Sequence, residues 1–321
     1  MDEDDRATDH RITPEEDGVH HSWDNDISPV CTIEPGDIVE FSCRDATNGQ
    51  IDADSTVADL AGLDIEQVHA LTGPVAIEGA TPGDVLAVEI LDVSHQGWGY
   101  TLVLPGEFEH GLLAEEFPEP TLHIWDLHDG VARFNDGIEV PISPFPGILG
   151  VAPAESGSFE TFPPRPTGGN IDIKHLTPGS TAYLPVEVED ALFSIGDCHA
   201  AQGDGEVCGT GIEAPMSVTC RFDIETGRSI DAPQFETDGP FTPRGRDERM
   251  FGTTGVGDDL YAASADAVRA MVEHLHEERG LAREQAYVLC SAAVDLKINQ
   301  IVNAPNWTVS AYLPERVFRE E

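Results

Sequence analysis

The residues best able to carry chemistry lie in one short run, from position 194 to position 215. This run contains Asp197, His199, Gln202, Asp204, Glu206 and Glu213, with glycines at 203, 205, 209 and 211. An unpaired buried carboxylate costs much free energy, so these groups either face solvent or converge on a metal, a substrate or each other. The glycines would let the backbone approach a ligand closely. Because Val207 and Ile212 interrupt the polar residues, we interpret the run as a functional site.

Aspartate, glutamate and histidine supply the oxygen and nitrogen ligands that divalent metals use in proteins. A metal at this run would polarise a carbonyl group and lower the pKa of a water molecule. A spare carboxylate, with Glu206 or Asp204 the best placed, would then act as general base. Alternatively, Cys208 and His199 could form a nucleophilic pair. Cys198 suits that role less well, because adjacent side chains on a strand point to opposite faces.

Several standard motifs are absent from the sequence. It has no P-loop, no Gly-x-Ser-x-Gly elbow and no His-Glu-x-x-His motif, and its glycines miss the dinucleotide-binding spacing. Lys174 and Lys297 are the only lysines, so a mechanism with a nucleophilic lysine is hard to build. A carboxylate and imidazole site remains as the main interpretation.

The chain is strongly acidic, with 17 Lys and Arg against 60 Asp and Glu and a net charge of −43. This charge disfavours binding to nucleic acid and to anionic membranes. Disorder does not fit a chain in which 40% of the residues are hydrophobic. An acidic surface for a basic partner is one alternative. We favour adaptation to molar salt, because the acidic residues are spread along the chain.

The cysteines and the N-terminal sequence indicate in which cellular compartment the protein is found. The six cysteines, at 31, 43, 198, 208, 220 and 290, form no CxxC pair, which argues against a disulfide scaffold or a zinc knuckle. Residues 1–9 are acidic and polar, unlike a signal peptide. No run approaches the roughly 18 apolar residues of a membrane span. We expect a cytoplasmic protein without membrane or nucleic-acid partners.

We expect residues 1–18 to form a flexible acidic arm and residues 19–321 to form the functional unit. Pro-Gly turns at 35–36, 82–83 and 178–179 each precede an alternating apolar pattern. These patterns predict strands of a β-rich body, built as meanders or a sandwich. A further strand is predicted at 217–222, and residues 228–257 are predicted to be loops and turns.

Two helices are predicted within about residues 258–297. Asp258 or Asp259 caps the first, an apolar stripe from Leu260 to Leu275 forms its inner face, and Gly280 ends it. The second helix is predicted from about Arg283 to Leu296, and residues 309–313 return as a strand. We therefore predict a mainly β chain with a smaller β/α region that includes a C-terminal helical hairpin.

Polar residues on separate turns could complete the site. Asp45 follows a predicted strand, His69 precedes a Thr-Gly-Pro turn, and Asp172 follows a Gly-Gly-Asn turn. A strand-end aspartate commonly caps a turn, so each of these residues is a candidate only in combination with the run at 194–215.

The segment from Gly196 to Glu213 resembles the central signature of the acetamidase/formamidase family; it reads Gly-Asp-Cys-His-Ala-Ala-Gln-Gly-Asp-Gly-Glu-Val-Cys-Gly-Thr-Gly-Ile-Glu. The likeness continues, in order, at 71–84, 140–153, 163–172 and 286–305. It covers the chain from about residue 20 to the end.

This resemblance implies an enzyme that hydrolyses small aliphatic amides to a carboxylate and ammonia. It also implies a β-sandwich body joined to a smaller α/β part, assembly into a homodimer or larger homo-oligomer, and a divalent metal, zinc or calcium, in the active site. Carried over to this chain, the core of the site is Asp197, His199, Asp204 and Glu206. Asp45, His69 and Asp172 are additional candidates.

We therefore predict a salt-adapted, metal-assisted amidase with a small amide as its substrate. The predicted metal ligands are Asp197, His199, Asp45, His69 and Asp172; the predicted catalytic residues are Glu206, Asp204 and His199; the predicted substrate contacts are Gln202, Phe145, Gly169 and Asn170. Two alternatives are an amidase that depends on Cys208 and a protein that binds a small molecule or metal on the same fold without turnover.

Overall fold

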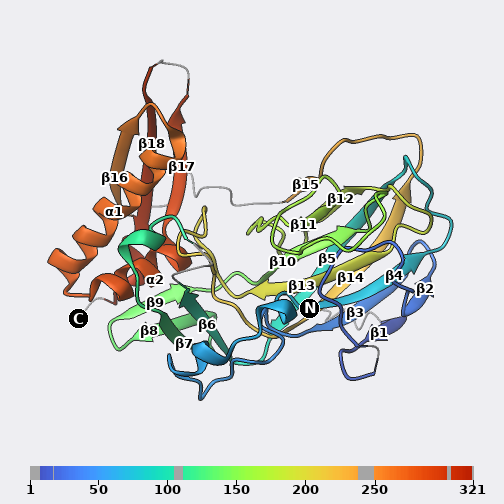
Figure 1. Cartoon of the computed structure of the whole chain (residues 1–321), viewed down its shortest axis with the longest axis horizontal. Helices are drawn as coiled ribbons and strands as arrows, with labels where there is room; N and C mark the ends of the chain where they lie inside the picture. The colour runs from blue at the N-terminus through green and yellow to red at the C-terminus, as the bar shows by residue number, and fades with distance from the viewer. Residues whose placement is uncertain (1–7, 17, 105–110, 238–248, 302–304, 320–321) are drawn as a thin grey trace, which may run out of the picture.

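The structure is a computed structural model that describes residues 8–16, 18–104, 111–237, 249–301 and 305–319. Two β-sheets packed face to face form its larger part, on the right of Figure 1. The first sheet runs in the order β1 (His10–Ile12), β3 (Ile38–Cys43), β14 (Met216–Glu225), β5 (Val85–His95), β12 (Thr181–Pro185) and β15 (Gln234–Glu236). The second runs in the order β11 (Gly168–Asn170), β10 (Phe145–Val151), β13 (Phe193–His199), β4 (Leu71–Ile77) and β2 (Cys31–Ile33).

Aromatic rings close the space between these two sheets. Phe193 of β13 lies 5.8 Å from Phe41 of β3 and 5.0 Å from Phe222 of β14, measured between ring centroids. All three side chains are fully buried, so they anchor the sandwich core. The predicted β-sandwich body is confirmed.

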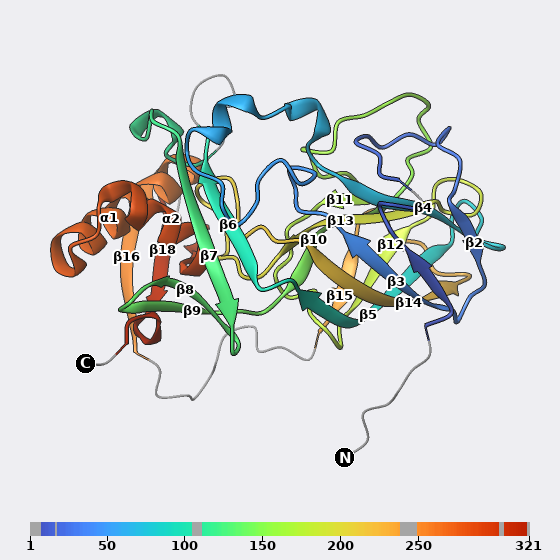
Figure 2. The same ribbon diagram turned by 90° about the horizontal axis from the view of Figure 1, so that it is seen from below.

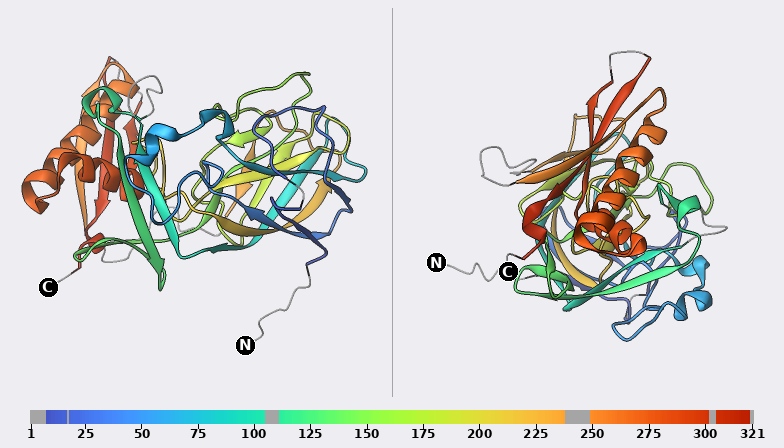
Figure 3. Two further views of the ribbon diagram at one scale, coloured as in Figure 1. Left: turned by 60° about the horizontal axis from the view of Figure 1, so that its bottom comes forward. Right: turned by 90° about the vertical axis from the view of Figure 1, so that its left-hand side faces the viewer.

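A smaller α/β part lies at the other end of the molecule. Its sheet has the order β16 (Met250–Gly257), β18 (Trp307–Pro314), β17 (Asp295–Gln300). Helices α1 (Leu260–Arg279) and α2 (Arg283–Ala293) cover one face of this sheet, as the right-hand view of Figure 3 shows. None of the helices in the described part of the chain is both long enough and apolar enough to cross a membrane.

A third layer of strands lies between the sandwich and the α/β part. It is a meander of β6 (Trp98–Val103), β7 (Thr121–His128), β8 (Val131–Asn135) and β9 (Ile138–Pro141). Figure 2 shows β6 and β7 between the sandwich and the helices. Short 3-10 turns at Asp59–Gly62, Ile65–Gln67, Ala114–Glu116 and Glu315–Val317 complete the described elements.

The predicted Pro-Gly turns each lead into a strand of the first sheet, namely β3, β5 and β12. The first helix also begins and ends as predicted. The Asp259 side chain accepts a hydrogen bond from the N–H of Ala262, and Gly280 ends the helix with a φ of 68°. Local turn and capping chemistry therefore determined these elements.

Three predicted boundaries differ from the structure. The second helix ends at Ala293 rather than Leu296, because Val294 is extended and residues 295–300 pair with β18. Residues 228–257 are not all loop, because they contain β15 and β16. The glycines at 252, 255 and 257 weaken the alternating pattern of β16. Within the expected acidic arm, residues 10–12 form β1, which pairs with β3.

Candidate active site

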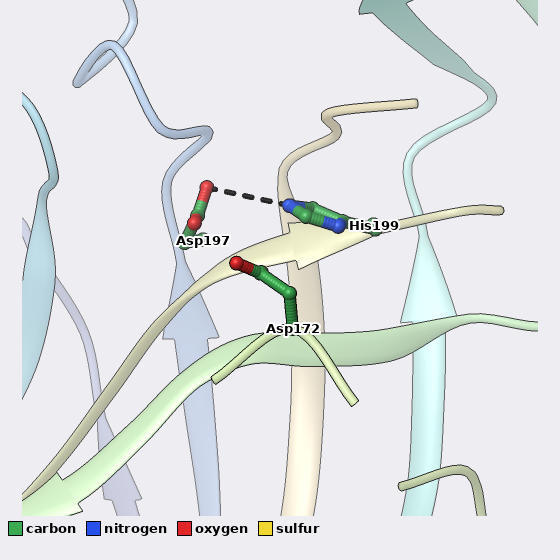
Figure 4. Close-up of side chains that lie close together, drawn as sticks. All are labelled: Asp172, Asp197 and His199. Carbon is green, nitrogen blue, oxygen red and sulfur yellow. Dashed lines mark ion pairs between the residues drawn. The ribbon is translucent and has the colours of Figure 1, made fainter. Parts of the chain in front are cut away.

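The run at 194–215 begins on β13, the central strand of the second sheet, and continues as a loop that pairs with β6 of the meander. Strand β13 contributes Asp197 and His199, and the loop contributes Glu206 and Glu213. Asp172 approaches from the segment after β11. In Figure 4 the side chains of Asp172, Asp197 and His199 lie close together, with an ion pair drawn between Asp197 and His199. Residues far apart in the sequence thus form one cluster.

Short backbone contacts fix the positions of these acidic residues. The N–H and C=O groups of Glu213 bond to those of Tyr100 on β6, both at 2.8 Å. The N–H of Asp172 donates to the carbonyl of Gly147 on β10 at 3.2 Å. A Cβ atom on Gly147 would lie 2.7 Å from the Asp172 Oδ1 atom, so a glycine is needed there. The second sheet and the meander therefore position the cluster.

The imidazole of His199 is the centre of the cluster. Its Nε2 atom lies 3.1 Å from Glu213 Oε2, 3.6 Å from Asp197 Oδ1 and 4.0 Å from Glu206 Oε1. Its Nδ1 atom lies 2.7 Å from Gln202 Oε1. Since an amide oxygen can only accept a hydrogen bond, this contact places a proton on Nδ1, and the other ring nitrogen, Nε2, faces the carboxylates. Burial lowers the pKa of His199, but the Glu213 and Asp197 carboxylates outweigh it and raise this pKa well above its usual range.

Three buried polar atoms in this space make no hydrogen bond of normal geometry among the described residues, although the first two lie 3.1 Å apart as an ion pair. They are Nε2 of His199, Oε2 of Glu213 and Oδ1 of Asp172. Buried polar atoms are usually satisfied, so unpaired atoms that face one another indicate a ligand. Two overlapping groups of ligand atoms lie within 4.8 Å of one another: Asp172, Asp197 and His199, and His199, Glu206 and Glu213.

The electrostatics also fit a cation. Burial raises the pKa of Asp172 to about 7 and that of Glu213 to about 8. In both cases the His199 imidazole opposes this shift and the Asp197 carboxylate adds to it. Burial, followed by repulsion from Asp172, raises the pKa of Glu206 well above its usual range. So many carboxylates cannot all ionise together unless a positive charge compensates them. Oxygen-rich ligands with one imidazole suit a divalent metal ion.

Asp197 behaves differently from its neighbours. Burial alone would favour its neutral form, but the His69 and His199 rings outweigh this and hold the pKa of Asp197 below its usual range. The Nε2 atom of His69 lies 3.8 Å from Asp197 Oδ2, and its Nδ1 atom lies 3.1 Å from the Thr161 hydroxyl. Asp197 is therefore the carboxylate that stays ionised in this cluster.

Three of the acidic residues adopt backbone conformations that are uncommon for residues with a side chain. The φ angle is 46° at Asp172, 52° at Asp197 and 42° at Glu206. Such conformations carry strain and tend to gather at functional sites. Their concentration here supports a role in ligand binding rather than in packing.

A cavity of about 200 Å³ opens beside the cluster. Asp197, Glu206 and Glu213 line one part of it, together with His69 and Asn170. Leucine, isoleucine, valine and phenylalanine side chains line another part. The site thus combines a polar, acidic end with an apolar wall, which is typical of small-molecule sites.

Most of the predicted site residues meet at this cluster. Asp197, His199, Glu206 and Asp172 share it, and His69 contacts Asp197. Gln202 contacts His199 from behind, and the Phe145 ring lies 5.2 Å from the imidazole. Asn170 lines the cavity, whereas Gly169 packs against Trp23.

Two predicted residues do not join the cluster. Asp45 accepts hydrogen bonds from the N–H groups of Thr47 and Gly49 and from the Tyr100 hydroxyl, so it caps a turn. Asp204 belongs to neither of the two ligand groups around His199, and its carboxylate lies 3.3 Å from Lys174 Nζ. Both carboxylates have partners of their own, and the ligand role of Asp45 and the catalytic role of Asp204 stay predictions.

Glu213 is the functional candidate to which the sequence prediction gave no role. It lies in the signature run, but the motif does not show that β6 would bring it beside His199. A carboxylate directly between Ile212 and Ala214 was the available signal, because such a residue is unlikely to face solvent.

The cysteines offer little support for a nucleophile. The Cys208 thiol lies 3.5 Å from the carbonyl oxygen of Leu102, and burial raises its pKa to about 11. Both ring nitrogens of His199 face other groups. Cys208 therefore lacks the lowered pKa that an activated thiol requires.

The fold and the site together define a mainly β protein with a buried carboxylate and histidine centre suited to hydrolysis. Residues 6–158 and 154–320 match the model of the Acetamidase/Formamidase family, so the chain belongs to that family and is an amidohydrolase.

Individual relatives agree with this assignment. A formamidase from Methylophilus methylotrophus is 31% identical and aligns over 95% of this chain and 90% of its own length. A gamma lactamase from Delftia acidovorans superposes with a TM-score of 0.88 at 28% identity, covering 97% of this chain and 94% of that one. An acetamidase from Bacillus halodurans superposes with a TM-score of 0.67 at 33% identity, covering 95% and 97%.

Proposed function

We propose that this chain hydrolyses small amides to a carboxylate and ammonia at the His199 cluster, with the help of a divalent metal ion. The observation that carries this proposal is the set of three buried atoms that make no hydrogen bond, Nε2 of His199, Oε2 of Glu213 and Oδ1 of Asp172. Family membership and the formamidase and acetamidase relatives support the reaction.

Asp172, Asp197 and His199, with Glu206 and Glu213 beside them, are the residues that would hold the metal. When bound, a divalent metal supplies positive charge that polarises the amide carbonyl and makes a nearby water more acidic. Zinc suits the imidazole and carboxylate set, and calcium suits a site in which carboxylates predominate. The Gln202 contact fixes the ring orientation and the tautomer of His199.

Glu206 is our candidate for the proton carrier. Its side chain is the most exposed of the three that face Nε2 of His199, and it lines the cavity. It would accept a proton from the attacking water as the new C–O bond forms. It would return this proton to the amide nitrogen as the C–N bond breaks. The pKa of its carboxyl group is raised, as that of a residue which exchanges protons near neutral pH often is.

Ammonia release from formamide and acetamide tests this proposal. It should be measured at high KCl before and after treatment with a chelator, with the metal content determined on the same sample. We expect chelation to remove activity and the matching metal to restore it. Activity that survives chelation but is lost on thiol alkylation would favour Cys208. Bound metal without turnover of any amide would favour a binding protein.

Assembly into a dimer or larger oligomer and adaptation to molar salt are part of the same proposal. The salt proposal rests on the net charge of −43 and on the spread of acidic residues along the chain. Light scattering at high and low KCl would test the assembly, because a monomer at every salt concentration contradicts it.

A further inference from the structure

The three-stranded sheet of the α/β part has one covered face and one open face. On the covered face, α1 lies directly against β16, because a Cβ atom on Gly255 would collide with the carbonyl oxygen of Ala263. Successive side chains of a strand point to opposite faces, so the residues on either side of Gly255 belong to the other face. All the residues of β16 on that face are exposed, namely Met250, Gly252, Thr254 and Val256.

This open face lacks the acidic residues that other solvent-facing strands carry. In the sandwich, outward positions of β5 and β14 hold the exposed Asp92 and Asp223. The exposed residues of β16 are uncharged. Residues 296–314, which form most of β17 and all of β18, contain no Asp or Glu, and this is the longest such run in the sequence. In a chain with 60 acidic residues, such a face is atypical of one that stays in water.

Exposed apolar side chains extend the open face at one end of the sheet. Val256 and Ile298 are 60% and 59% exposed, and they lie opposite adjacent residues of β18. Ile301 directly follows β17, and Tyr261 lies in the first turn of α1, beside the same end. These are four of the six large hydrophobic side chains that are exposed in the described part of the chain. In Figure 1 this end of the sheet stands above the sandwich.

The charges near this face have both signs. Asp295 at the start of β17 is paired with Lys174, and the Lys297 ammonium lies 5.6 Å from the centre of the Tyr312 ring. The acidic pair at 258–259 begins α1 beside the apolar end, and the carboxylate of Asp259 caps that helix. The region as a whole is therefore far closer to neutral than the chain, whose net charge is −43.

These features favour a second copy of the chain as the partner. Two copies that each carry a charge of −43 repel one another over most of their surfaces, so they can approach closely only where acidic residues are scarce. A basic partner would be attracted to the acidic strands of the sandwich instead. A two-fold contact brings the same patch of both copies together, and an uncharged, apolar patch is complementary to itself.

We propose that two copies of this chain associate through the open face of the β16–β18–β17 sheet and the exposed apolar side chains at its end. This inference rests on the assembly proposed above and adds the surface that forms it. A stable interface buries about 800 Å² on each partner, which is more than four side chains provide, so the contact includes the open face of β16. Molar salt screens the remaining repulsion between the copies.

The mass of the protein in molar KCl, measured by size exclusion with light scattering, tests the surface. Val256→Glu places a carboxylate opposite its own copy and removes the burial of one valine from each partner. We expect the dissociation constant to rise at least about tenfold. The matched control is Val57→Glu, the same change at a residue that is 48% exposed and lies outside the α/β part. This control should keep the mass of the unchanged chain.

Thr254→Arg separates the local contact from general repulsion. The change makes the net charge of the chain less negative, so association at any other surface should become stronger. At the open face the arginine finds no acidic partner and is repelled by its own copy. We therefore expect weaker association here as well. Stronger association of Thr254→Arg would overturn the inference.

Hydrogen exchange shows where the contact lies and whether the variants are folded. The backbone amides of β16 should exchange at least about tenfold faster in Val256→Glu than in the unchanged chain, while the sandwich strands exchange equally in both. An unchanged chain that is a monomer at every KCl concentration overturns the assembly and this inference with it. An oligomer that both variants leave intact overturns the surface alone. Ammonia release tests amide hydrolysis separately from either result.

Discussion

The Nδ1 atom of His199 lies 2.7 Å from the side-chain oxygen of Gln202. The Gln202 amide nitrogen in turn donates to the carbonyl oxygen of Asp172 at 3.1 Å. Gln202 therefore connects two candidate ligands from different segments. It fixes the ring of one and the backbone of the other, as residues behind a metal site commonly do.

Replacing Gln202 should weaken metal binding. Gln202→Leu keeps the approximate size but removes the acceptor for Nδ1, so the imidazole loses its fixed tautomer. We expect the affinity for the divalent metal to fall about 10- to 100-fold. Titration calorimetry with the metal-free protein would measure this. Gln96→Leu, at an exposed residue between β5 and β6, is the control, and an equal loss in both variants would contradict the role of Gln202.

Glu206 and Asp204 should respond differently to loss of charge. Glu206→Gln should lower kcat by about 10²- to 10⁴-fold, the usual contribution of a general acid or base. Asp204→Asn should cost less than about tenfold, because Asp204 faces Lys174 rather than His199. The steady-state kinetics of both variants on one amide would decide this. If Asp204→Asn lowers kcat more than Glu206→Gln does, Asp204 rather than Glu206 carries the proton.

Lys174 should couple the sandwich to the α/β part. Its Nζ atom pairs with Asp295 at the start of β17 and lies 3.3 Å from Asp204, while the N–H of Asp204 donates to Asp295 at 3.1 Å. These groups are partly buried, so Lys174→Met or Asp295→Asn should lower the free energy of unfolding by about 1–3 kcal/mol.

Urea unfolding at constant KCl would measure these losses. The double variant should lose less than the sum of the two single losses, because each single change removes the same interaction. Simple additivity would mean that the pair contributes nothing of its own.

Two buried histidines should make stability fall in mild acid. Burial lowers the pKa of His20 and of His123 from 6.5 to about 4. The unfolded chain therefore binds more protons than the folded one between these values. Stability from each group is complete above pH 6.5 and is lost as the pH falls toward about 4. The loss is up to about 1.4 kcal/mol per pH unit for each group.

His123→Phe isolates one of these contributions. The ring packs between Trp125 and Phe134, with centroid distances of 4.7 and 4.3 Å, so phenylalanine fits the site. Urea unfolding across this pH range should show a shallower loss in the variant than in the unchanged chain. If the free energy of unfolding falls equally with pH in both proteins, the pKa of His123 does not change on unfolding.

Salt should stabilise the folded chain. A net charge of −43 repels itself, and added ions screen that repulsion. We expect Tm to rise steadily from low to molar KCl, with the largest gain at the low end. Calorimetric scans would record this, and sucrose at matched osmolality controls for excluded solute. A Tm independent of KCl would refute the salt adaptation.

Local sequence patterns predicted much of the fold and the position of the site. The Pro-Gly turns predicted β3, β5 and β12, and the caps at Asp259 and Gly280 predicted α1, because turn and cap chemistry acts over a few residues. The dense run at 194–215 predicted where the polar groups would gather. Strand β16 was not predicted, because its glycines interrupt the alternation of apolar and polar residues that is typical of a strand.

The sequence by itself determined which residue types could act, and the tertiary structure decided which of them meet. Asp204 and Glu206 are two residues apart in one turn, yet only Glu206 faces His199. The loop is fixed by backbone bonds from Gly203 to Ser291 and from Leu296 to Asp204, so contacts with the α/β part set its orientation. Glu213 enters the site because β6 pairs with it. Such choices depend on packing between segments far apart in the chain, and no local pattern contains that information.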